Sequence, residues 1–135
     1  MTGGIVLATI SHPSIVVGVA AQPSLPSQIP FSSLARRQDL GMDHHDVEAA
    51  ALSETPLLIL RYGKDKFCPA ERMESIKVTI PSSLFPSQAL QDKLACQVSH
   101  ATLTDRFRPG RSSETKEVSN EAITNVTLFL FEHLA

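Results

Sequence analysis

Hydrophobic positions along the chain gather in short runs that end at proline, glycine or serine. The run at residues 4–10 is continuous and stops before His12 and Pro13. Periodicity does not separate a buried strand from a helix here, but the short length and the proline stop favour a strand. Residues 57–62 form a second continuous run, of the kind that a central parallel strand shows. A third run at 94–99 is also typical of a strand.

Other segments carry the marks of helices. Residues 46–54 end at a Thr-Pro pair, and residues 70–76 follow Pro69, which suits a first helical turn. The last segment has one broad apolar face at 3.6-residue spacing. That face comprises Val118, Ala122, Ile123, Val126, Phe129, Leu130 and Leu134. Strands that alternate with helices predict an α/β fold with a parallel sheet.

A stretch at about 17–46 departs from this alternation. Positions 22–33 hold three prolines and four serines, which disfavour both helix and sheet. We therefore expect a loop or insertion at 17–46, with little regular structure over 22–46. The remainder of the 135 residues predicts a single domain with loops at 81–86 and 106–113.

The composition excludes several classes of function. The net charge is −2, aromatic residues make up 5% and there is no tryptophan, so a nucleic-acid surface is not expected. No apolar run approaches about 18 residues, so we expect no membrane span. The start lacks a basic segment, so no secretory signal is expected. Cys68 and Cys96 match neither a zinc nor a disulfide framework, and both are read as packing residues in a cytoplasmic protein.

Two adjacent histidines raise the question of a metal. His44 and His45 lie between Asp43 and Asp46. Adjacent histidines on a polar segment seldom converge on one ion, and no third group of ligands accompanies them. We therefore predict solvated side chains, no metal site and no cofactor.

Two polar residues follow predicted strands. Asp65 comes three residues after the strand at 57–62, and His100 comes directly after the strand at 94–99. The carboxyl edge of an open α/β sheet is where ligands bind. An acid followed by a histidine is the order of the second half of an α/β-hydrolase triad, in which the carboxylate orients the imidazole. On spacing alone, an ordinary turn aspartate and a structural histidine remain the alternative.

Three segments resemble the dienelactone hydrolase family. They are LLILRYGKDKFCPAE at 57–71, Ser11-His12-Pro13-Ser14 as a small-residue–His-Pro-Ser element after a strand, and TLFLFEHL at 127–134. The resemblance implies the C-terminal half of an α/β hydrolase that acts on lactones and related carboxylic esters with a cysteine or serine nucleophile. It implies that Asp65 is the triad acid, that His100 is the base, and that Arg106 binds the carboxylate of a small anionic substrate.

The chain departs from the family at the nucleophile. The elbow Gly-x-Cys/Ser-x-Gly-Gly is absent. If Gly3 and Gly4 are its tail, the nucleophile position falls on Met1, and if residues 4–10 are a strand, the elbow lies upstream. Ala101 and Thr102 also replace the Gly-Phe that usually follows the family's histidine. We therefore expect a truncated hydrolase domain that self-associates through an exposed sheet edge; the alternative is a non-catalytic remnant or interaction protein.

Overall fold

A three-stranded parallel sheet forms the centre of the protein. A computed structural model describes residues 2–23, 34–98 and 102–135. The strands are β1 (Gly18–Ala21), β2 (Leu57–Leu60) and β3 (Ser83–Leu84), in the order β1-β2-β3. Gly18 pairs with Leu57, and Leu57 pairs with Ser83. The predicted α/β class with a parallel sheet is confirmed.

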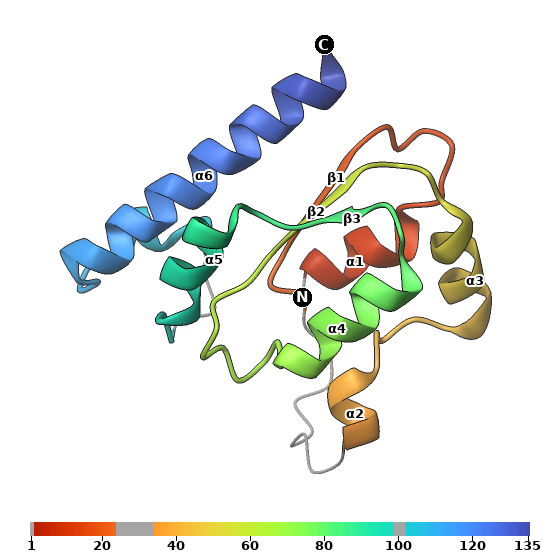
Figure 1. The fold of residues 1–135 in the computed structure, drawn as a ribbon, viewed down its shortest axis with the longest axis horizontal. Coiled ribbons are helices and arrows are strands. Elements are labelled where there is room, and N and C mark those ends of the chain that lie inside the picture. Colours follow the sequence, from red (N-terminus) through yellow and green to blue (C-terminus); the bar gives the residue numbers. More distant parts are fainter. Residues whose placement is uncertain (1, 24–33, 99–101) are drawn as a thin grey trace.

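Helices cover both faces of this sheet (Figure 1). They are α1 (Thr2–Thr9), α2 (Leu34–Gln38), α3 (His44–Leu52), α4 (Ala70–Thr79), α5 (Gln88–Ala95), the 3₁₀ turn η1 (Asp105–Phe107) and α6 (Ser113–Leu134).

The central strand β2 supplies side chains to two cores. Leu57 and Ile59 pack into a cluster with residues of α1, α3 and α4. Leu58 and Leu60 point the other way and pack with residues of α5 and α6. All four side chains are buried. This explains why the strand has a continuous apolar run instead of an alternating one.

The expected strand at 4–10 is wrong, because residues 4–9 lie in α1 and Ile10 lies in the turn that follows it. Leu7 and Ile10, three positions apart, are fully buried, whereas Ile5 is 63% exposed. That spacing is the spacing of a helix face, and the helix packs on β1 and α3.

The expected strand at 94–99 is also wrong over the described residues. Leu94 lies near the C-terminus of α5. Ser87 caps the start of this helix, because its hydroxyl accepts a hydrogen bond from the Leu90 amide. Leu90 and Leu94 are both buried because i and i+4 side chains share one helix face. The third strand is instead β3, inside the loop expected at 81–86; two residues are too few to produce a hydrophobic pattern.

The stretch at 17–46 is more regular than expected. It contains β1 and α2, and α3 begins at its end. Asp43 caps α3 by accepting from the Asp46 amide, so this helix begins two residues before the expected helix at 46–54. Residues 24–33, the core of the Pro/Ser-rich segment, lie outside the described residues. No helix in the described part of the chain is long and apolar enough to cross a membrane.

Candidate functional site

Asp65 lies in a buried turn at the carboxyl edge of the sheet. The turn begins directly after β2, and the side chain of Asp65 is only 3% exposed. Its Oδ1 accepts a hydrogen bond from the Phe67 amide at 2.8 Å, and its own amide donates to the Tyr62 carbonyl at 3.2 Å. The aspartate therefore organises the turn through local hydrogen bonds, as aspartates in turns commonly do.

The turn also donates backbone hydrogen bonds to carbonyl groups at the end of α5 and just after it. The Gly63 amide donates to the Leu94 carbonyl at 2.8 Å, and the Lys64 amide donates to the Gln97 carbonyl at 3.0 Å. Gly63 is required for this approach, since an added methyl group would lie 2.7 Å from the carbonyl carbon of Ala95 and closer still to its Cα and oxygen. The acid turn is thus fixed in place against the neighbouring helix.

Gln22 is a residue of this site that the sequence did not reveal. It follows β1, at the same sheet edge, and is 4% exposed. Its Nε2 donates to Asp65 Oδ2 at 3.1 Å, and its Oε1 accepts from the Thr102 amide at 2.8 Å. Gln22 has a φ of 53°, an uncommon value for a residue with a side chain. The sequence placed Gln22 at the start of a Pro/Ser-rich loop and carried no signal of this role.

His100 lies outside the described residues, so its pairing with Asp65 stays a prediction. Thr102, two positions later in the sequence, is described and fully buried. Its amide donates to Gln22, and its carbonyl accepts from the Ser119 hydroxyl at 2.8 Å. Thr102, two positions after the predicted base, is therefore linked to Asp65 through the side chain of Gln22.

Arg106, the residue expected to bind substrate, lies on η1 and is exposed. Its guanidinium stacks over the ring of Phe107 at 4.7 Å, and its amide donates to Ser119 Oγ at 3.2 Å. The exposed guanidinium is available to an anion.

Buried polar side chains gather around Asp105, the first residue of η1. Asp105 is fully buried, and its Oδ1 accepts from Arg111 Nε at 3.0 Å. Burial, and then the neighbouring charge of Asp105, raise the pKa of Tyr62 well above its usual range. Ser119 also contacts this cluster and ties it to Thr102. These residues support the segment after position 101 from the side of α6.

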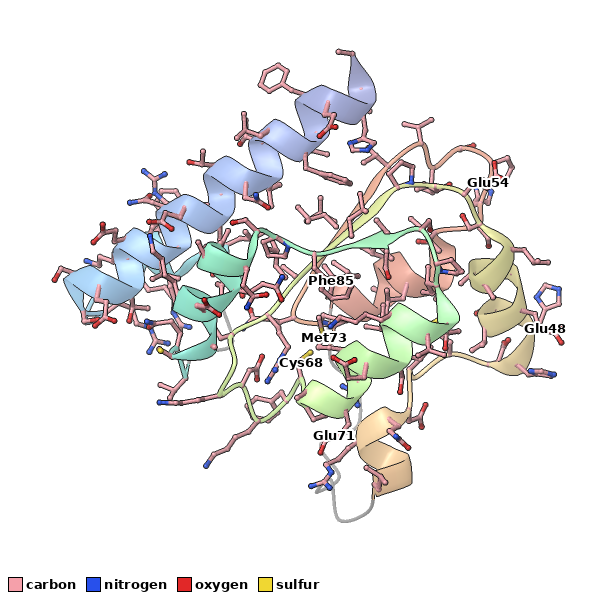
Figure 2. The ribbon with its side chains drawn as sticks, viewed as in Figure 1. Glu48, Glu54, Cys68, Glu71, Met73 and Phe85 are labelled. Atoms are coloured by element: carbon pink, nitrogen blue, oxygen red, sulfur yellow. The ribbon has the colours of Figure 1, made fainter. Side chains whose placement is uncertain are left out.

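Cys68 is unsuited to act as a nucleophile. It is fully buried, and its Sγ lies 4.0 Å from Met73 Sδ at the start of α4 (Figure 2). Burial raises the pKa of its thiol to about 12, although the neighbouring Arg61 opposes the shift. A thiol attacks as the thiolate, so a raised pKa makes Cys68 unreactive. Cys96, in contrast, is exposed.

The structure also bears on the two elbow alternatives. Gly3 and Gly4 lie in α1, so the alternative that required a strand at 4–10 is wrong. Ser11-His12-Pro13-Ser14 accordingly follows a helix, and not the strand that the resemblance expected. The strand before the acid strand, β1, ends instead at Ala21 and is followed by Gln22.

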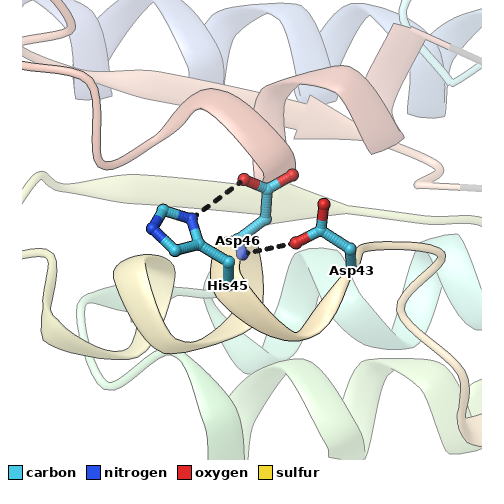
Figure 3. A group of neighbouring side chains, drawn as sticks. All are labelled: Asp43, His45 and Asp46. Carbon is cyan, nitrogen blue, oxygen red and sulfur yellow. Dashed lines mark hydrogen bonds and ion pairs between the residues drawn. The ribbon is translucent and has the colours of Figure 1, made fainter.

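Asp43, His45 and Asp46 lie close together at the start of α3 (Figure 3). Asp43 accepts from the Asp46 amide at 2.9 Å, and His45 Nδ1 lies 4.0 Å from Asp46 Oδ1. His44 makes a separate contact of 3.2 Å with Glu48, one turn along the helix. Helix capping and exposed surface pairs account for all these contacts.

A cleft of about 240 Å³ opens between α4 and α5. Its lining includes Arg61 and Gly63 from the end of β2, but not Asp65. Lys77, on its α4 side, pairs with Glu74 at 3.0 Å and lies over the ring of Phe85. Lys77 and Glu74 therefore neutralise each other, and Asp65 is not among the residues that line the cleft.

Comparisons of the chain with protein-family models, with curated proteins and with solved structures found no match.

Proposed function

We propose that the chain contributes the acid and the base of a hydrolase that acts on carboxylic esters or lactones, with Asp65 as the acid and His100 as the base. The observation that carries the proposal is the place of Asp65, a buried carboxylate at the carboxyl edge of a parallel sheet. Its Oδ2 is linked through Gln22 to the backbone of Thr102, two positions after His100.

In this proposal the Asp65 carboxylate orients the imidazole and stabilises its charged form. The imidazole takes the proton of a serine or cysteine nucleophile as that group attacks the carbonyl carbon. It then returns the proton to the leaving oxygen, and water hydrolyses the acyl intermediate by the same route. Cys68 is not this nucleophile, because its thiol is buried and its pKa is raised to about 12. Arg106 offers an exposed guanidinium for the carboxylate of an anionic substrate.

One observation favours a non-catalytic protein as the second candidate. The two oxygens of Asp65 accept hydrogen bonds from the Phe67 amide and from Gln22. The first bond stabilises the turn, and the second links the turn to the end of β1. A purely structural aspartate would make the same bonds. The two candidates therefore differ in whether Asp65 also acts on His100.

Titration of the histidine side chains by NMR separates these candidates without requiring turnover. If Asp65 pairs with His100, the pKa of His100 falls by about one unit or more in Asp65→Asn, because the neutral amide no longer stabilises the imidazolium. His12, on the exposed segment after α1 and outside the acid turn, is the internal control. An unchanged pKa of His100 in folded Asp65→Asn would contradict the hydrolase proposal and favour the structural one.

Turnover gives a further measurement. The sequence contains no nucleophile elbow, so the 135-residue chain is expected to hydrolyse an activated aryl ester or an enol lactone no faster than background. Hydrolysis that Cys68→Ala or Cys96→Ala removed would show that the nucleophile has been misplaced.

A further inference from the structure

We infer that Gln22 is a positioning residue that couples the acid Asp65 to the backbone at Thr102. The inference rests on the proposed function for its catalytic meaning, while the coupling itself concerns only described residues. Gln22 comes from the end of β1, Asp65 from the turn after β2, and Thr102 from the segment before η1. One buried side chain thus joins three segments that are far apart in the sequence.

The chemistry of the two partners fixes the orientation of the Gln22 amide. The Thr102 N–H can only donate, so the atom that faces it at 2.8 Å is Oε1. The ionised carboxylate of Asp65 can only accept, so the atom that faces it at 3.1 Å is Nε2. A side chain at this place needs an acceptor and a donor at its tip, which glutamine has and an apolar side chain of similar length lacks.

The backbone of Gln22 shows that the bridge is held in one geometry. Its φ of 53° lies in the left-handed region, and its amide donates to the Leu60 carbonyl at 2.6 Å. Residues other than glycine adopt this conformation at a cost, so surrounding contacts must maintain it. The left-handed turn directs the Gln22 side chain to Asp65 and Thr102 as the chain leaves β1.

Thr102 makes hydrogen bonds with the side chains of both Gln22 and Ser119, so a substitution at Ser119 provides a matched control. Ser119, on α6, donates from its Oγ to the Thr102 carbonyl at 2.8 Å, whereas Gln22 donates to Asp65 itself. Ser119→Ala therefore loosens Thr102 without removing a donor from Asp65. Gln22→Met keeps the length and burial of the side chain but removes its hydrogen bonds to Asp65 and Thr102. Gln22→Gly removes the same bonds and suits the positive φ, so it tests the bridge where Gln22→Met fails to fold.

The experiment measures, by NMR in the 135-residue protein, hydrogen exchange at the Thr102 amide, the carboxyl carbon resonance of Asp65 and the pKa of His100. In Gln22→Met and Gln22→Gly, the Thr102 amide should exchange about tenfold faster, as expected for the loss of one ordinary hydrogen bond. The carboxyl carbon resonance of Asp65 should shift, because the Gln22 donor to its Oδ2 is lost. The pKa of His100 should move toward its value in Asp65→Asn.

Ser119→Ala should accelerate exchange at Thr102 and leave the carboxyl resonance of Asp65 unchanged. The inference is overturned if folded Gln22→Met and Gln22→Gly keep the wild-type carboxyl resonance of Asp65 and the wild-type pKa of His100. If Gln22→Met shifts the carboxyl resonance of Asp65 but Asp65→Asn leaves the pKa of His100 unchanged, the coupling stands and the proposed hydrolase function fails. The two failures are therefore distinguishable.

Discussion

Replacing Gly63 by alanine should disrupt the contact between the acid turn and α5. Gly63 is the first residue of the turn beyond Tyr62, and its amide donates to the Leu94 carbonyl at 2.8 Å. An added methyl group would lie 2.7 Å from the carbonyl carbon of Ala95, against about 3.5–4.0 Å for a comfortable carbon contact. The obstructing atoms are backbone, so no side chain can rotate away, and the end of α5 must move by roughly an ångström.

The cost follows from that displacement. Overpacking against a well-packed region costs about 1–3 kcal/mol and occasionally more. A clash with backbone belongs at the upper end, so Gly63→Ala should lower the free energy of unfolding by about 3 kcal/mol. Reduced flexibility of the unfolded chain offsets this by about 0.4–1 kcal/mol. The expected net loss is thus about 2–3 kcal/mol.

Urea denaturation followed by circular dichroism measures this loss, with Gly110→Ala as the matched control. Gly110 has a φ of 78° and nothing within 4 Å of an added methyl group. Gly110→Ala therefore reports only the cost of a left-handed backbone, about 1–2 kcal/mol. Faster hydrogen exchange of the Gly63 amide should accompany the loss in Gly63→Ala. A loss below 1 kcal/mol, with the Gly63 amide still protected, would refute the close approach of α5 to the acid turn.

Two further predictions concern buried groups. Because burial raises the pKa of Cys68 to about 12, the unfolded state releases this proton first as the pH rises, and stability should fall by about 1.4 kcal/mol between pH 8 and pH 10. Urea denaturation at both pH values should show a smaller fall in the free energy of unfolding for Cys68→Ala than for the wild type. Iodoacetamide at pH 8 should label Cys96 but not Cys68 in the folded protein, and equal labelling would contradict the burial of Cys68. Arg111→Met should cost about 2–3 kcal/mol, because it leaves the fully buried Asp105 with Arg108 at 3.7 Å as its remaining ion pair. The exposed Arg106 provides the control, and Arg106→Met should cost less than about 0.5 kcal/mol.

The sequence predicted those elements in which burial requires several apolar residues in a row or at a regular spacing. β2 is buried on both faces, so every one of its four residues is apolar. α6 repeats its apolar face over several turns, with Val118, Ala122 and Phe129 buried at helical spacing, although Leu134 in the last turn is exposed. In both elements many residues report the same environment, so one exception does not change the prediction.

The incorrect predictions concern segments whose apolar pattern fits both a strand and a helix, or is too short to be read. Residues 4–10 are apolar on nearly every side, and only tertiary packing decides that Leu7 and Ile10 face the sheet as a helix. The strand expected at 94–99 begins with Leu94, which belongs to α5 because Leu90, one turn earlier, shares its buried face. Strand β3 has two residues, and no periodicity can be read from two positions.

The same contrast applies within the candidate site. Asp65 could be identified because a local pattern, an apolar strand followed by a polar turn, places it at the sheet edge. Gln22 could not, because its role depends on partners 43 and 80 positions away and on a left-handed backbone that is uncommon for glutamine. Local patterns report the element in which a residue lies, whereas a bridge between elements depends on how those elements pack. A substitution at Gln22 is therefore the more discriminating probe of the site, since it changes the relation between Asp65 and Thr102 while leaving both residues in place.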